Sequence, residues 1–248
     1  MTDDRPILTG MSVPAPTSAE PAGQGIAVPA AVGLIVAAVV AALALVGLVV
    51  SLDSDKLPTG PAMAPPPAPV PEVSYDSLLR TARYDNIRVS MPGNPYECPD
   101  SPGQVPPVLA SGILCNATVH PEYDGSSDWA ASAAFGSVPD DLTRPTAEGT
   151  AKAVFQQWRS AAFGKQDTTL SDYGTEKVDL GGQPVTLVHG NVHYTVKGVP
   201  SSYDRVVVVA LPARSGGYAA YISSRPDDTP KATLDKLDRS LNTLRYET

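Results

Sequence analysis

Several kinds of residue are scarce in this sequence. Its 248 residues include two cysteines, three histidines and two tryptophans. Eighteen basic residues stand against 26 acidic ones, which gives a net charge of −8. The basic residues are dispersed and form no stripe, so the electrostatic footprint of a nucleic-acid-binding protein is missing. The sequence also lacks a G-x-S-x-G turn, a glycine-rich phosphate loop and the alternating acids of a calcium loop.

The histidines do not form a metal-binding pattern. They are His120, His189 and His193. The last two lie four residues apart in a segment whose Val, Tyr and Thr content favours a strand. In a strand, four residues span roughly 13 Å, whereas the two-histidine zinc motif needs helical spacing. We therefore expect ordinary sheet residues here, with no metal site and no cofactor.

Two pairs of neighbouring carboxylates remain as candidates for chemistry. Asp140-Asp141 and Asp227-Asp228 each lie near a turn or a helix start, where acids interact favourably with the helix dipole. Trp129 and Trp158 are expected to be core residues. Since no nucleophile and base are paired in any familiar motif, we predict no catalytic residues.

A long stretch contains no charge at all. Between Glu20 and Asp53 there is no charged residue, and residues 26–50 are dominated by Ala, Val, Leu and Ile. As a helix these residues would reach roughly 37 Å, enough for a hydrocarbon core of about 30 Å. A cleavable signal peptide is the rival interpretation, but the leader is acidic and the apolar run is too long. We predict an N-terminal tail over 1–25 and a retained transmembrane helix over 26–50.

The orientation of this span depends on the cysteines. Few basic residues flank the span, with Arg5 on one side and Lys56 on the other, so the positive-inside rule does not decide its orientation. Cys98 and Cys115 flank a proline-rich segment, and an even pair outside the cytosol most simply forms a disulfide, worth roughly 3 kcal/mol. Two unrelated buried thiols are the alternative. We expect a single-pass membrane protein with a cytoplasmic N-terminus and an extracytoplasmic C-terminal domain.

Small residues recur along the span. Gly33, Ala37 and Ala41 share one stripe at four-residue spacing, which would let a second helix approach closely. This helix-packing stripe would suit a homo-oligomer or a larger membrane protein complex. The alternative is that an alanine-rich span contains such spacings by chance.

A proline-rich linker follows the span. Leu57–Pro71 holds seven prolines in fifteen residues, which favours an extended polyproline conformation. We assign 51–72 to the linker, which would hold the following domain away from the bilayer. Residues 73–248 are then one domain of ordinary size.

The hydrophobic pattern of that domain predicts three helices and seven strands. A short helix capped by Ser74 would place Tyr75, Leu78, Leu79 and Ala82 on one face. A longer helix spans Thr146–Phe163, and a last helix has Thr229 as N-cap, Pro230 first, and Leu234, Leu237, Leu241 and Leu244 on one stripe. The strands are Ile87–Met91, Ile113–Val119, Trp129–Val138 (whose alanines also allow a helix), Thr175–Leu180, Val185–Val196, Arg205–Leu211 and Tyr218–Ser223, and 92–112 is a loop. The order predicts an α+β domain in which an antiparallel sheet is flanked by helices.

This order resembles the Mog1/PsbP-like fold, a family that includes small envelope lipoproteins of mycobacteria. The resemblance rests on Met91-Pro92 after an early strand, a helix ending near Phe163, the hairpin Leu180–Val185, and a final strand and helix carrying Pro226 and Ser240-Leu241. The composition, rich in Ala, Val, Pro, Asp and Gly and poor in Lys, resembles proteins of high-GC actinobacteria. The family mostly comprises binding and assembly modules without catalysis of their own, so the resemblance implies an accessory role.

Two functional hypotheses follow. The first is a non-catalytic, membrane-tethered accessory module of an actinobacterial cell envelope that associates with a larger secretion, transport or respiratory membrane complex. The second is an extracytoplasmic lipid or glycolipid binding protein. A sizeable apolar cavity would favour the second, and a filled core with an exposed apolar patch would favour the first.

Overall fold

The structure is a computed structural model that describes residues 71–105, 107–180 and 182–247. The predicted tail, the predicted span with Gly33, Ala37 and Ala41, and nearly all of the predicted linker lie outside these ranges. None of the helices within them is both long enough and apolar enough to cross a bilayer.

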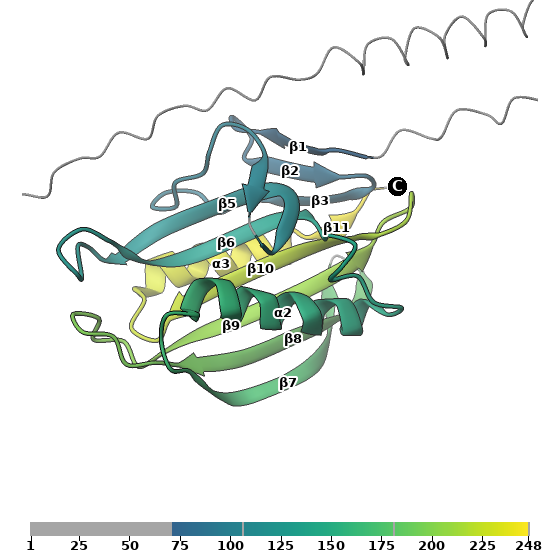
Figure 1. The fold of residues 1–248 in the computed structure, drawn as a ribbon. Helices are drawn as coiled ribbons and strands as arrows, with labels where there is room; N and C mark the ends of the chain where they lie inside the picture. Colours follow the sequence, from purple (N-terminus) through teal and green to yellow (C-terminus); the bar gives the residue numbers. More distant parts are fainter. Residues whose placement is uncertain (1–70, 106, 181, 248) are drawn as a thin grey trace, which may run out of the picture. The chain divides into compact units, whose positions relative to one another are not determined.

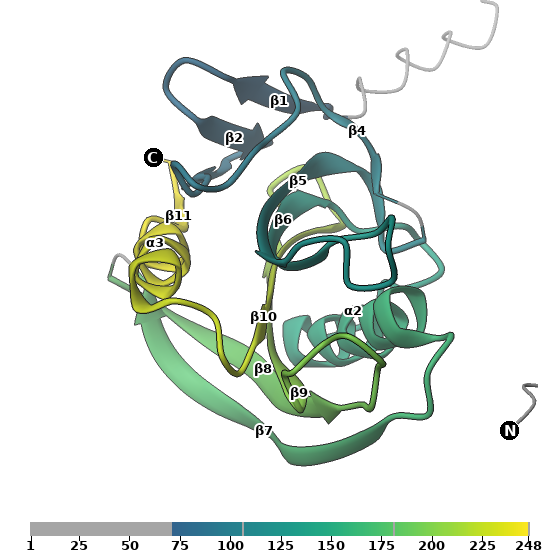
Figure 2. The same ribbon diagram turned by 90° about the vertical axis from the view of Figure 1, so that its left-hand side faces the viewer.

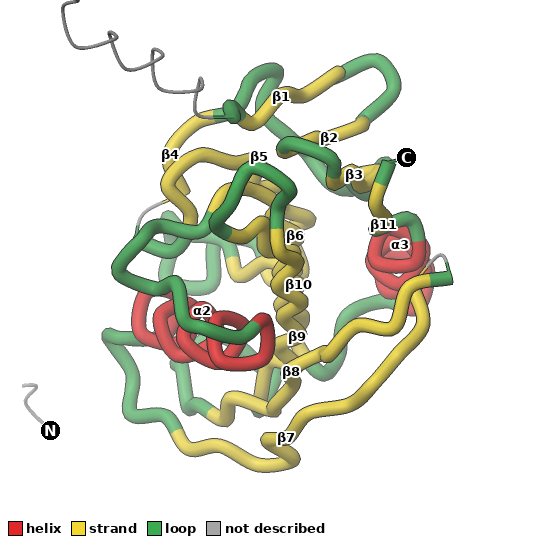
Figure 3. Tube along the Cα trace, turned by 90° about the vertical axis from the view of Figure 1, so that its right-hand side faces the viewer, coloured by secondary structure: helices red, strands yellow, loops and turns green. Residues whose placement is uncertain are grey.

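A seven-stranded antiparallel sheet is the centre of the fold (Figure 1). Its strand order is β4-β5-β6-β10-β9-β8-β7. The strands are β4 (Gly103–Val105), β5 (Leu109–His120), β6 (Trp129–Ser137), β7 (Thr169–Leu180), β8 (Gln183–His193), β9 (Tyr203–Pro212) and β10 (Tyr218–Pro226). The helices α2 (Ala147–Phe163) and α3 (Lys231–Asn242) lie on opposite faces of this sheet (Figures 2 and 3).

A smaller sheet completes the α3 side of the molecule. Its order is β1-β2-β3-β11, formed by β1 (Val73–Asp76), β2 (Thr81–Tyr84), β3 (Ile87–Ser90) and β11 (Arg245–Tyr246). One hydrophobic cluster joins this sheet, α3 and one face of the large sheet. A second cluster joins α2 to the other face.

The two-residue period of the strands separates these two clusters. In β9, Val207, Val209 and Leu211 face the α3 side, whereas Val206, Val208 and Ala210 face α2. Because both faces are covered, this strand is a nearly continuous apolar run. The middle of the sheet is therefore buried on both faces, and the two faces have separate cores.

The helix α2 begins and ends as its sequence predicts. The Thr146 side chain accepts a hydrogen bond from the Gly149 amide at 3.0 Å, which satisfies one of the free N–H groups of the first turn. The apolar stripe that includes Val154, Phe155 and Trp158 is buried against the sheet. One apolar stripe opposite a polar face is typical of a helix packed on a sheet.

The predicted helix after Ser74 is wrong. This segment forms the hairpin of β1 and β2, because the Asp76 carboxylate accepts hydrogen bonds from the amides of Leu78 and Leu79 and closes a tight turn. Leu78 is 95% exposed, so the spacing that suggested a helix does not reflect a buried stripe. Ala82 is buried as part of a strand.

Two further local predictions need correction. The segment 92–112 is not loop throughout, because it contains β4 and the start of β5. The N-cap of α3 is Pro230 rather than Thr229, and the Thr229 hydroxyl donates to the carbonyl of Pro226 instead. The other predicted strands and both later helices are present with shifted ends, and the predicted α+β class is confirmed.

Candidate functional site

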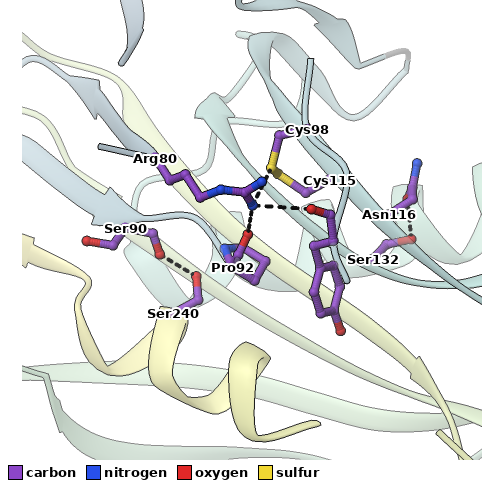
Figure 4. Close-up of a disulfide and its surroundings, with 9 residues drawn as sticks. Arg80, Ser90, Pro92, Cys98, Cys115, Asn116, Ser132 and Ser240 are labelled. Atoms are coloured by element: carbon purple, nitrogen blue, oxygen red, sulfur yellow. Dashed lines mark hydrogen bonds between the residues drawn. A yellow bond between two sulfur atoms is a disulfide. The ribbon is translucent and has the colours of Figure 1, made fainter. Parts of the chain in front are cut away.

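The predicted disulfide is present and ties a loop to the sheet. Cys98 and Cys115 are bonded, with an S–S distance of 2.05 Å. The Arg80 guanidinium donates to the carbonyls of Pro92 and Tyr96, the latter at 3.2 Å, and lies 3.9 Å from the Cys98 Sγ atom (Figure 4). The loop that precedes β4 is thus fixed at several points.

This loop forms one wall of an open cleft of about 1250 Å³. The other walls come from β5, β6, the β5–β6 loop and the last turns of α2. The lining residues are Pro95, Glu97, Cys98, Pro99, Asn116, Thr118, Tyr123, Asp128, Trp129, Ala130, Ser132, Trp158, Ser160, Ala161, Ala162, Phe163, Gly164, Lys165, Gln166, Asp204 and Ser224. A concave site of this size is large enough for a drug-sized molecule or a peptide segment.

The floor of the cleft is polar because α2 does not cover that part of the sheet. Under the helix, the α2-facing side chains of the sheet include Val206, Val208 and Ile222. On β5 and β6 the same face carries polar groups, and the Ser132 hydroxyl donates to the Asn116 amide oxygen at 2.8 Å (Figure 4). On this face of the sheet, one part is therefore buried core under α2 and another part is the floor of the open cleft.

A buried carboxylate also belongs to this floor. Asp204, on β9, is 2% exposed. Its Oδ1 atom accepts from the Tyr194 hydroxyl at 2.7 Å and from the Trp129 indole at 3.3 Å, and its Oδ2 atom accepts from the Ser224 hydroxyl at 2.8 Å. All three donors are neutral.

Burial decides the protonation behaviour of this group. Loss of solvation raises the pKa of Asp204 to about 6, although the hydrogen bonds from Tyr194, Ser224 and Trp129 lower it. Burial also raises the pKa of the Tyr194 hydroxyl, and the charge of Asp204 adds to that effect. Asp204 is therefore ionised at neutral pH but close to its titration range.

The β5–β6 loop forms the rim above this floor. The Asp124 carboxylate accepts from the amides of Ser126 and Ser127, and these bonds lower its pKa to about 2. Asp128 accepts from the Glu122 amide at 2.9 Å and the Thr118 hydroxyl at 2.8 Å, which lowers its pKa as well. Asp124 and Asp128 thus stay ionised at neutral pH and hold the loop in shape.

Two polar atoms of cleft residues lack partners among the described residues. Trp158 is 7% exposed, and its Nε1 donor is buried without an acceptor. The Gln166 Oε1 acceptor is buried without a donor. Both tryptophans are buried, as expected for core residues, and both also line the cleft.

The histidines lie elsewhere. His189 and His193 are on β8, and the His193 Nε2 atom is 2.7 Å from the Ser171 hydroxyl. Within the described ranges there is no group of three or more His, Cys, Asp or Glu residues placed to hold a metal ion. None of the three histidines lines the cleft.

His120, Ser201 and Asp228 meet in a cluster that has the composition of a catalytic triad but a different geometry. The His120 Nε2 atom lies 2.7 Å from the Ser201 hydroxyl and 3.1 Å from the Asp228 carboxylate, and that hydroxyl also donates to Asp228. In a triad the serine and the acid contact opposite nitrogens of the ring. Here both contact the same nitrogen, which fits a structural link between the end of β5 and two loops.

The neighbouring carboxylate pairs have structural surroundings too. Asp227 accepts from the Ser202 amide at 3.0 Å and the Ser202 hydroxyl at 2.7 Å. Asp140 and Asp141 lie in the turn that precedes α2. Asp227 and Asp228 make hydrogen bonds to the β8–β9 loop, and Asp228 also contacts His120 on β5, whereas the sequence suggested interaction with a helix dipole.

Sequence reasoning missed Asp204. Asp204 lies on the same face of β9 as Val206 and Val208, so extending the predicted strand by one residue would have placed a carboxylate on a buried face. A charged residue at a position that the pattern buries is a usable sign of a functional or network role.

Comparison with known proteins does not identify a family for this chain. No family model matches the chain, and no curated protein matches it. The chain is similar to the solution structure of the cyanobacterial PsbP protein (CyanoP) from Synechocystis, with 14% identity and a TM-score of 0.38 over 74% of this chain and 96% of that one. At that TM-score the likeness does not assign a family.

Proposed function

We propose that this chain is a non-catalytic, membrane-tethered accessory module of an actinobacterial cell envelope, and that its domain binds a protein partner from a larger membrane complex. The observation that carries the proposal is the open cleft of about 1250 Å³, whose walls are held by a disulfide and by hydrogen bonds. A preformed, rigid concave surface lowers the entropy lost when a partner binds.

The chemistry of the lining suits recognition. Its polar groups are mainly hydroxyls, amides and carboxylates that already serve as hydrogen-bond acceptors, as Asp128 and Asp204 do. Apart from the disulfide-bonded Cys98, the lining contains no cysteine and no histidine. Such groups fix the orientation of a bound segment without transferring atoms to it.

A second feature favours a protein partner. Leu78 and Leu79 form an exposed apolar tip on the β1–β2 turn, and the Asp76 carboxylate holds that turn in place. Exposed apolar side chains on a fixed turn are typical contacts at protein interfaces. The disulfide supports an extracytoplasmic location, because such bonds persist in oxidising compartments.

The rival function, lipid or glycolipid binding, makes a different demand on the cleft. An acyl chain needs apolar walls, whereas the exposed lining here is more polar than apolar. A sugar headgroup would find hydrogen-bond partners in Asn116, Thr118 and Ser132. The experiment must therefore be able to recover either kind of partner.

The test is purification of the full chain from native membranes in mild detergent, followed by mass spectrometry of proteins and lipids. Ala161→Phe fills the cleft from an exposed position on α2, and Gln156→Phe places the same side chain on the same helix outside the cleft. We expect one membrane protein to co-purify with the wild type and Gln156→Phe, and about tenfold less with Ala161→Phe, equivalent to about 1.4 kcal/mol. Recovery of a lipid and no protein would instead establish the rival.

A further inference from the structure

The negative charge on the cleft floor has no cationic counterpart. Within the described ranges, none of the ion pairs includes Asp204. A carboxylate that is 2% exposed and surrounded by neutral donors is expensive to keep ionised unless a cation approaches it. Its three hydrogen bonds leave one of about four lone-pair sites free, on Oδ2.

The walls of the cleft have the same sign of charge. Glu97 and Asp128 are its other carboxylates, and Lys165 is its one basic residue among those described. Three carboxylates would repel an anionic ligand. They would attract a cationic ligand as it approaches, and its charge would balance theirs once it is bound. The charge balance therefore favours a ligand that carries a positive group.

Aromatic side chains specify which kind of cation fits. Trp129 packs edge-on against Tyr123 with ring centroids 5.5 Å apart, and Trp158 is a further aromatic residue of the cleft lining. A planar, weakly hydrated guanidinium group stacks on such rings and is the cation best suited to buried pairing with carboxylates. A compact, strongly hydrated ammonium group has less to gain there.

The unmatched polar atoms indicate that the cation belongs to a peptide. The buried Trp158 Nε1 atom is a donor without an acceptor, and the buried Gln166 Oε1 atom is an acceptor without a donor. A peptide backbone supplies both N–H groups and carbonyls, the two kinds of partner that these atoms lack. A small free amine would satisfy at most the acceptor.

We propose that the cleft takes an arginine side chain from an extended segment of the protein partner, with the guanidinium directed toward Asp204. This inference rests on the proposed function, because it names the part of the partner that the cleft recognises. The backbone next to that arginine would pair with Trp158 and Gln166, and Glu97 and Asp128 would attract the segment to the cleft.

The test uses the fluorescence of the two tryptophans, both of which line the cleft. The full chain, purified in detergent, is titrated with a capped pentapeptide containing a single arginine among alanines. A second peptide carries citrulline, the neutral analogue of arginine, at the same position, and methylguanidinium serves as the free-cation probe. We expect saturable binding of the arginine peptide, and at least tenfold weaker binding of the citrulline peptide and of methylguanidinium.

Two variants complete the experiment. Asp204→Asn keeps the shape of the side chain and removes its charge, so we expect it to lose the preference for arginine over citrulline. Glu176→Gln removes one negative charge from an exposed position on β7 and should keep that preference. Equal binding of the two peptides by the wild type, or an unchanged preference in Asp204→Asn, would overturn the inference. If the arginine peptide fails to bind while the membrane partner still co-purifies, the inference is wrong and the proposed function stands.

Discussion

At the scale of single residues, the cleft depends on an aspartate that few sequence rules would select. Asp204 combines deep burial with three hydrogen bonds whose donors lie 10, 20 and 75 residues away along the chain. Such an environment raises the pKa through lost solvation while the donors limit the rise. The balance has a measurable consequence for stability.

Because of Asp204, the free energy of unfolding should fall as the pH rises. The pKa of this group is raised to about 6 in the folded state, against about 3.9 in an unfolded chain. Folding therefore favours the protonated carboxyl group. Its contribution to the free energy of unfolding is complete below about pH 4 and is lost as the pH rises through about 6. The difference corresponds to roughly 3 kcal/mol. Relative to Asp204→Asn, the wild type should lose about that much unfolding free energy between pH 4 and pH 7, measured by urea unfolding.

A charge-matched control separates this effect from general titration. Glu176→Gln changes an exposed acid on β7, so its unfolding free energy should run parallel to that of the wild type across the same pH range. A pH-independent difference between the wild type and Asp204→Asn would mean that the buried carboxylate does not titrate as described.

Gly198 should be intolerant of a side chain for two separable reasons. Its φ angle is +88°, and a Cβ atom would lie 2.1 Å from the Tyr123 carbonyl oxygen on the rim of the cleft. Gly125 has a φ angle of +89° but open space around it. We expect Gly125→Ala to lower the unfolding free energy by about 1 kcal/mol through backbone strain alone, and Gly198→Ala by roughly 2–4 kcal/mol. If thermal unfolding shows equal losses of unfolding free energy in the two variants, the Tyr123 backbone shifts easily to make room for the added Cβ atom.

At the scale of elements, the longer segments were predictable, whereas among the strands of four residues or fewer only β3, whose apolar alternation continues to Met91, was predicted. The helix α2 has a threonine cap and a long apolar stripe, and both signals lie within its own sequence. The strands β1, β2 and β11 have four, four and two residues, too few for a period to show. In the β1–β2 turn, the spacing of Leu78 and Leu79 suggested a helix because sequence does not report that both are exposed.

The Cys98–Cys115 bond should stabilise the domain by roughly 3 kcal/mol, because it closes a loop with a sequence separation of 17. The suitable variant combines Cys98→Ser with Cys115→Ala, since Cys115 is fully buried among apolar side chains. Urea unfolding should show that loss in the variant, and reductant should produce a similar loss in the wild type.

Reductant also provides the control for that prediction, because the double variant should not respond to it. The backbone hydrogen bonds between Glu97 and Asn116, at 2.8 and 3.0 Å, should survive and keep the loop near the sheet. A variant as stable as the oxidised wild type would show that those bonds and Arg80 suffice to order the loop.

At the scale of the whole molecule, the α+β class followed from the pattern of the elements, but the cleft did not. Its walls come from a loop before β4, the strands β5 and β6 with the loop between them, and the end of α2, which meet only in the folded chain. In the sequence, the polar residues of β5 and β6 look like the ordinary alternation of a half-exposed strand. Without α2 beside them, Asn116, Thr118 and Ser132 would be no more than that. The cleft is therefore a property of the assembled sheet and helix.

The proposed topology predicts which side of the membrane the two thiols face. The chain contains two cysteines, both in the domain, so a membrane-impermeant thiol reagent added to intact cells after reduction reports on the domain alone. We expect labelling first at Cys98, which is half-buried, and slowly at Cys115, which is fully buried. As a control, Ser12→Cys in a background of Cys98→Ser and Cys115→Ala should react only after the cells are permeabilised. The opposite pattern, with Ser12→Cys reactive in intact cells and Cys98 protected, would place the domain in the cytoplasm, where the disulfide would not be expected to persist.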